Sequence, residues 1–266
     1  MVDFDITNLA ADKQEKIAIG ALKYIAIKKA FELKMPLYEN VLFRKYFTDF
    51  YGLEGGSWKN AVSQEIFYRL FEGIRVNYAD NLNNTNDLVS TYTKIYNFLS
   101  YMSGHNEKSF SSKILHTLCD ISPIIDSNIL GGFGISAQED KGIISSKKAM
   151  ESYEKLLGWY YNTKQTKITK SYKNKSKKED IIYNADKGFI EYIESEEFKK
   201  EVGNFSNKFV EICYNAYDKL RTTFSKDFEE LKISNVETEL RNISLVKKID
   251  FYLWANFSDK KGKNND

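Results

Sequence analysis

Apolar side chains recur at steps of three and four residues along most of the chain, which is the spacing of one face of an α-helix. This pattern predicts helices over residues 12–34, 37–50, 58–74, 88–102, 145–161, 204–232 and 235–257. With only two prolines and 14 glycines in 266 residues, the chain has too few turn residues for a β-sandwich. We therefore predict an all-α, multi-helix globular protein, with two helical lobes around a cleft as one arrangement of these helices.

The distribution of polar segments predicts how the chain is organised. Residues 1–11 are expected to form an N-terminal arm, and residues 12–258 a single all-α domain with a basic loop at 162–180. Residues 259–266 are expected to be a disordered charged tail. Hydrophobic residues make up 42% of the chain and aromatic residues 15%, so the domain can bury a substantial core.

The cysteines and histidines are few and show no metal-binding spacing. Cys119 and Cys213 lie on apolar helical patterns and are expected to be buried thiols rather than a disulfide. His105 and His116 are the only histidines, and neither a His-Glu-x-x-His nor a paired Cys-x-x-Cys motif is present. The sequence therefore predicts no metal and no cofactor.

No stretch of the chain has the pattern of a membrane span. The most apolar N-terminal run, residues 17–27, is interrupted by Lys23 and flanked by further lysines. No signal peptide is recognisable either. The expectation is a cytoplasmic protein with no membrane partner.

One segment concentrates positive charge. Of the 39 basic side chains, seven are lysines between residues 164 and 178, a stretch without an acid, and the other 32 accompany 37 acidic side chains. Such a segment can keep the protein soluble, or it can bind phosphates through counterion release. On the second interpretation the nucleic-acid-binding residues are Lys164, Lys167, Lys170, Lys173, Lys175, Lys177 and Lys178, together with Ser112.

The stretch from residue 109 to residue 128 concentrates residues capable of chemistry. Serines precede an apolar helical pattern, which predicts a short helix beginning near Ser111 with Lys113 in its first turn. The helix dipole there disfavours an ammonium and so favours a nucleophilic neutral amine. An extended segment containing Pro123 is long enough to return Asp126 to the same end. The plainer interpretation is a solvated lysine and an aspartate that caps the next helix.

This stretch, Ser-Ser-Lys-Ile-Leu-His-Thr-Leu-Cys-Asp-Ile-Ser-Pro-Ile-Ile-Asp-Ser-Asn, resembles the catalytic segment of the helix-hairpin-helix DNA glycosylases. The resemblance implies that Lys113 attacks the sugar carbon and that Asp126 assists it. The Gly-x-Gly hairpin that precedes the lysine in that family is absent here, and the interval between lysine and aspartate is shorter.

Two classes of function follow from these observations. One is a nucleic-acid-binding protein, with DNA preferred over RNA, that carries out glycosylase-like base excision with catalytic residues Lys113 and Asp126. The alternative is a non-catalytic helical interaction protein of a phage-defence or regulatory type. A helical ribonuclease toxin has little support, because no arginine lies four to six residues before either histidine.

Overall fold

The structure is a computed structural model that describes residues 5–55, 57–78, 82, 85–126, 146–161, 168–169, 180–181 and 205–257. It confirms the prediction of an all-α, multi-helix globular fold. The helices are α1 (Ala11–Phe31), α2 (Val41–Tyr51), α3 (Ala61–Tyr78), α4 (Thr85–Ser103), α5 (Lys108–Leu118), α7 (Ser146–Tyr161), α10 (Phe205–Glu230), α11 (Val236–Asn242) and α12 (Leu245–Phe257). Two 3₁₀ turns, Ile6–Asn8 and Leu53–Gly55, and a two-residue antiparallel ladder between β1 (Ile168–Thr169) and β2 (Asp180–Ile181) complete the described elements.

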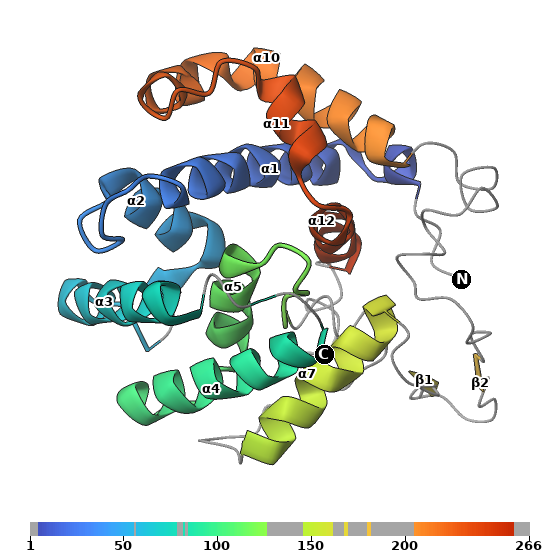
Figure 1. Cartoon of the computed structure of the whole chain (residues 1–266). Coiled ribbons are helices and arrows are strands. Elements are labelled where there is room, and N and C mark those ends of the chain that lie inside the picture. The colour runs from blue at the N-terminus through green and yellow to red at the C-terminus, as the bar shows by residue number, and fades with distance from the viewer. Residues whose placement is uncertain are drawn as a thin grey trace, which may run out of the picture.

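Helix α1 lies at the centre of one half of the molecule. Helix α10 packs along it, α2 and α12 also contact it, and α11 links α10 to α12 (Figure 1). Buried residues occur all around α1 from Ile17 to Ala30, whereas a surface helix would bury only one stripe. The sequence of α1 is therefore that of a helix covered by neighbours on several sides.

The other half is built on α4, which contacts α5, α7 and α3 (Figure 1). Aromatic rings fill much of the interior between these helices. Tyr92 of α4 stacks on Tyr153 of α7 with ring centroids 4.2 Å apart, and Phe67 of α3 contacts Phe110 of α5. One continuous cluster of buried side chains includes residues of both halves, so the expected division into two lobes is not confirmed.

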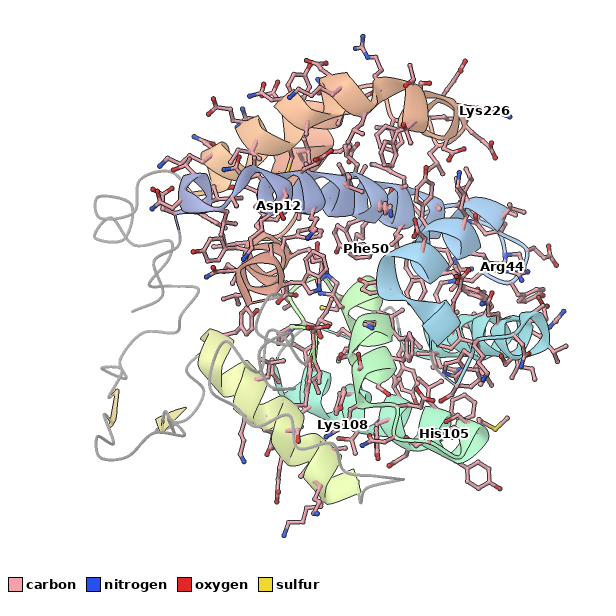
Figure 2. The ribbon with its side chains drawn as sticks, turned by 180° about the vertical axis from the view of Figure 1, so that it is seen from behind. Asp12, Arg44, Phe50, His105, Lys108 and Lys226 are labelled. Carbon is pink, nitrogen blue, oxygen red and sulfur yellow. The ribbon has the colours of Figure 1, made fainter. Side chains whose placement is uncertain are left out.

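Side-chain caps set several helix ends. Asn40 accepts a hydrogen bond from the backbone N–H of Phe43 and so caps α2, and Gly52 ends that helix with a positive φ of 67°. Figure 2 shows Phe50, a half-buried residue near the end of α2, between the helices, whereas Lys226 points outward from α10.

The predicted helix over residues 235–257 is wrong in one respect, because the chain breaks between α11 and α12. The Ser244 hydroxyl accepts a hydrogen bond from the backbone N–H of Lys247 at 3.2 Å and donates one to the carbonyl of Asp120 at 2.8 Å. Serine favours such local bonds over continuing a helix, and this one starts α12 in a new direction. Apolar periodicity continues through the break and does not reveal it.

Helix α3 turns its aromatic residues, rather than all of its aliphatic ones, toward the core. Val62 and Ile66 are 72% and 42% exposed, whereas Phe67, Tyr68 and Phe71 are fully buried. Aromatic rings bury more area than aliphatic side chains, so they determine which face of the helix points inward.

Within the predicted N-terminal arm, Ile6 is fully buried. The predicted tail, 259–266, lies outside the described residues.

Candidate active site

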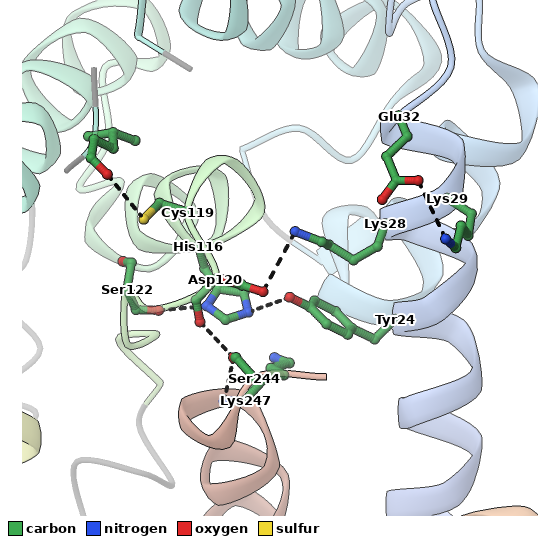
Figure 3. Close-up of polar contacts among 11 residues, drawn as sticks. Tyr24, Lys28, Lys29, Glu32, His116, Cys119, Asp120, Ser122, Ser244 and Lys247 are labelled. Atoms are coloured by element: carbon green, nitrogen blue, oxygen red, sulfur yellow. Dashed lines mark hydrogen bonds and ion pairs between the residues drawn. The ribbon is translucent and has the colours of Figure 1, made fainter. Parts of the chain in front are cut away.

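The segment that follows α5 is held by a buried histidine. His116 contacts the hydroxyl of Tyr24 through Nε2 at 2.9 Å and the backbone carbonyl of Ser122 through Nδ1 at 2.5 Å (Figure 3). Because a carbonyl can only accept, Nδ1 carries the proton and Nε2 accepts from Tyr24. Burial holds the pKa of His116 well below 6.5, so the ring is neutral. The histidine thereby ties the turn after α5 to α1.

A second tie fixes the extended segment that leads to Asp126. The Oγ of Ser112, on α5, accepts a hydrogen bond from the backbone N–H of Ile125 at 2.9 Å. Ile124 and Ile125 are buried, as their apolar character predicts. The next residue, Asp126, is therefore brought back along α5 to the region of Lys113.

These elements enclose a pocket of about 450 Å³. Its walls come from α1, the end of α2, α5, residues 124–126 and α12. Seven charged side chains line it: Lys16, Lys23 and Asp49 come from α1 and α2, and Lys113, Asp126, Lys247 and Asp250 come from α5, the segment 124–126 and α12. The volume is in the range of small-molecule sites.

Lys113 is a partly buried side chain of this pocket. Its Nζ donates to the carbonyl of Tyr51 at 3.2 Å and lies 4.6 Å from the ring centroid of Phe110. Burial lowers the pKa of Lys113 to about 8, while the negative charges of Asp126 and Glu107 act in the opposite direction. A usable fraction of neutral amine is therefore present near neutral pH.

The predicted reason for this neutral amine was wrong. Helix α5 begins at Lys108, with Glu107 at its N-cap position, so Lys113 lies in the middle of the helix rather than in its first turn. The helix dipole acts within the terminal turn and does not account for the shift. Removal of the side chain from water is the dominant cause.

Lys247 and Asp250 on α12 were not identified from the sequence as site residues. They are 3% and 2% exposed. The Nζ of Lys247 lies 4.9 to 5.5 Å from the ring centroids of Tyr24, Phe50, Tyr51 and Phe251. Burial lowers the pKa of Lys247 and raises that of Asp250, and each group opposes the shift of the other. The one sequence feature that could have indicated them is a pair of charged residues, one helical turn apart, within an otherwise apolar run.

The structure brings together the two predicted catalytic residues, since Lys113 and Asp126 line the same pocket and interact electrostatically. The predicted nucleic-acid contact of Ser112 finds no support in its position, because Ser112 is fully buried and its hydroxyl bonds within the protein. The seven lysines between 164 and 178 lie outside the described residues. Asp250 and Trp254, one helical turn apart on α12, both line the pocket.

Three further observations concern the cysteines, the potential metal ligands and the helix lengths of the described residues. Cys119 and Cys213 are free thiols; Cys213 is buried and Cys119 partly buried. No group of three or more potential metal ligands occurs among the described residues. None of the helices in the described ranges has the length and apolar character needed to cross a bilayer.

Comparison with known proteins yields no relative for this chain: no protein-family model, no curated protein and no solved structure matches it. The functional conclusion therefore depends on the pocket itself.

Proposed function

We propose that the protein binds nucleic acid and that its pocket carries out glycosylase-like base excision, with Lys113 as nucleophile and Asp126 as the assisting carboxylate. The observation that supports the proposal is the shared pocket: two residues 13 positions apart in the stretch that resembles the glycosylase segment lie around one cavity of about 450 Å³. The lowered pKa of Lys113 suits a nucleophilic amine.

The proposed reaction uses only groups of this pocket and the substrate. The neutral amine of Lys113 forms a bond to the sugar carbon as the bond from that carbon to the base nitrogen breaks, and the departing base takes up a proton. The amine nitrogen loses a proton, and the carboxylate of Asp126 stabilises the positive charge that develops at the sugar. The bond between the sugar carbon and the ring oxygen then breaks, the ring oxygen takes up the remaining amine proton, and an imine is left between Lys113 and the opened sugar of the DNA.

The burial of charge in this pocket favours a functional role. Lys247 and Asp250 are almost fully buried, and among the described residues neither takes part in an ion pair within 4.0 Å. Buried charges without a direct partner lower stability and cluster at functional sites. The amines of Lys113 and Lys247, together with the carboxylates of Asp126 and Asp250, suit acid–base chemistry on a bound substrate.

Trapping tests the chemistry. Borohydride should reduce the imine and leave a covalent complex between the protein and DNA containing modified bases. Lys113→Ala should abolish the complex, whereas Lys23→Ala, at the same pocket but paired with Asp49 at 2.7 Å, should retain it. Lys247→Ala is the sharper control, because the amine of Lys247 lies in the same pocket and has a similarly lowered pKa. This variant should also retain the covalent complex. Trapping that survives in Lys113→Ala would exclude Lys113 as the nucleophile.

Binding across a salt series tests the nucleic-acid part. Single- and double-stranded DNA and RNA are compared for wild type and for a variant with the seven lysines between 164 and 178 changed to glutamine. Each lost phosphate contact should reduce the slope of log affinity against log salt by about 0.9 on duplex DNA. The matched control replaces seven exposed lysines elsewhere, namely Lys34, Lys59, Lys147, Lys148, Lys219, Lys226 and Lys232.

Equal losses in the two variants would show that total charge, rather than the basic segment, provides the affinity. Absence of binding at low salt would contradict the nucleic-acid proposal and leave the alternative of a non-catalytic helical interaction protein.

A further inference from the structure

One oxygen of the Asp250 carboxyl has no well-aligned hydrogen-bond donor among the described residues, although the backbone N–H of Ile124 is close enough to favour the ionised carboxylate and lower its pKa. Oδ1 accepts a hydrogen bond from the Tyr160 hydroxyl at 2.5 Å, whereas Oδ2 is buried and no donor among the described residues forms a hydrogen bond with it. The side chain is 2% exposed and lines the pocket. A buried acceptor without a donor costs about 1 to 3 kcal/mol, so this oxygen points to a donor that arrives with a ligand.

The hydroxyl of Tyr160 also orients the carboxyl. Tyr160 lies on α7 and is fully buried, so its bond to Oδ1 is shielded from water and fixes the direction of the other oxygen. Lys247, one turn earlier on α12, directs its Nζ toward aromatic rings, and no ion pair within 4.0 Å joins it to Asp250. Oδ2 is thus left without an ion-pair partner, in a side chain that lines the pocket.

The apolar part of the pocket favours a flat ligand. Phe50 and Phe251 contact each other with centroids 5.8 Å apart, and Trp254 lies one turn after Asp250, 37% exposed. Aromatic faces of this kind stack on planar rings, and heterocyclic bases have such a face whatever their sequence. The pocket combines stacking surfaces with a single buried acceptor.

We propose that Oδ2 of Asp250 accepts a hydrogen bond from an N–H group on the edge of a nucleobase held in this pocket. The inference rests on the proposed function in that the pocket receives a base, but it does not require the chemistry of Lys113. Asp250 is then the residue that selects bases by their N–H edge, and Tyr160 is the residue that positions it.

The test measures equilibrium binding of nucleosides to the full chain by ligand-detected NMR. Adenosine, guanosine, cytidine and thymidine are compared with counterparts in which every N–H of the base is methylated. The proteins are wild type, Asp250→Asn and, as a control, Asp49→Asn, which removes an exposed carboxylate from the same pocket. Thermal unfolding checks that each variant folds.

At pH 8, above the Asp250 pKa of about 7, methylation should weaken binding to wild type and to Asp49→Asn about tenfold or more, which is the loss expected when a hydrogen bond to a charged acceptor disappears. In Asp250→Asn this discrimination should fall to the part caused by the bulk of the methyl group, because the amide presents its NH₂ where Oδ2 stood. This comparison separates the hydrogen bond from the bulk of the methyl group, whose effect would persist in the variant.

The result that would overturn the inference is equal discrimination in wild type and Asp250→Asn, or no nucleoside binding to wild type at millimolar concentration. Either result can occur together with imine trapping through Lys113, in which case the proposed chemistry stands and only the role of Asp250 fails. If Asp250→Asn does not fold, Tyr160→Phe replaces it, and the discrimination should fall as the carboxyl loses its orientation.

Discussion

The Oγ of Ser112 and the backbone N–H of Ile125 form a hydrogen bond of 2.9 Å across 13 residues of chain. This bond lies one residue before each of the two predicted catalytic residues, Lys113 and Asp126. It holds the return segment against α5, and so it determines whether the amine and the carboxylate line one pocket.

Ser112→Ala should lower the free energy of unfolding by about 1 to 3 kcal/mol, because the buried N–H of Ile125 loses its acceptor. Urea denaturation measures the loss. Ser152→Ala is the matched control, since Ser152 on α7 makes only a local bond to the carbonyl of Lys148 and should change stability by less than about 0.5 kcal/mol. Equal effects of the two substitutions would contradict the positioning role of Ser112.

His116→Ala should destabilise the fold by about 3 kcal/mol or more. The substitution leaves a cavity and removes the partners of the Tyr24 hydroxyl and the Ser122 carbonyl, which are all buried. His105 is the only other histidine and is exposed, so His105→Ala should leave thermal unfolding within experimental error of wild type. A stable His116→Ala protein would show that the turn is held by other contacts.

The buried carboxyl of Asp250 should make the protein less stable as the pH rises from about 4 to 7. Its pKa is raised from 3.8 to about 7, so over this range the folded state keeps a proton that the unfolded state has lost. The contribution falls by up to about 1.4 kcal/mol per pH unit. Asparagine does not titrate, and the stability of Asp250→Asn relative to wild type should therefore increase with pH.

Denaturation of both proteins at several pH values measures that difference. The comparison is made between the two proteins because His116 acts in the opposite direction. Its pKa is lowered by burial, so it makes the fold more stable as the pH rises toward 6.5. A constant difference between Asp250→Asn and wild type from pH 4 to 7 would contradict the raised pKa of Asp250.

Lys113 should have the opposite pH dependence at alkaline pH. Its folded pKa of about 8 lies below the ordinary value of 10.5, so between these values the unfolded state binds more protons than the folded state. The contribution of Lys113 to stability is unfavourable below pH 8 and becomes less so up to pH 10.5, by at most about 1.4 kcal/mol per pH unit. Wild type should therefore gain stability relative to Lys113→Met over this range.

Chemical denaturation from pH 7.5 to 10.5 checks this prediction. Lys23→Met serves as the control, because Lys23 is paired with Asp49 at the edge of the pocket rather than enclosed in it. Its stability relative to wild type should show no comparable trend. Parallel curves for Lys113→Met and wild type would indicate an amine of ordinary pKa, which would also weaken the proposal that Lys113 is the nucleophile.

Helix positions could be predicted from the chain because periodicity is a local property. The helices over residues 88–102 and 204–232 agree with α4 and α10 to within a few residues. The break at Ser244 could not be predicted from the sequence, because its cause is a hydrogen bond to the carbonyl of Asp120, which is more than a hundred residues away in the chain. The start of α5 was misplaced for a similar reason: serines at 109, 111 and 112 suggest a cap, but two of them are buried inside the helix.

The candidate site was predictable only in part. The length of the extended segment showed that Asp126 can return to the region of Lys113, and in the structure both residues line the same pocket. Lys247 and Asp250 were missed because a charged residue in an apolar helix has the same sequence pattern whether it faces water or a pocket. Tyr160 could be recognised as an aromatic residue at a helix end, but its bond to Asp250 depends on how α7 and α12 pack.

The sequence by itself determined the all-α class, the approximate helix positions, the concentration of reactive residues in 109–128 and the basic character of 164–178. These features depend on composition and on neighbours in the chain. Only the tertiary structure decided that α1, α5 and α12 enclose a common pocket, and that burial rather than the helix dipole lowers the pKa of Lys113. Burial is a property of the packed chain, because a side chain loses its water only when residues distant in sequence cover it.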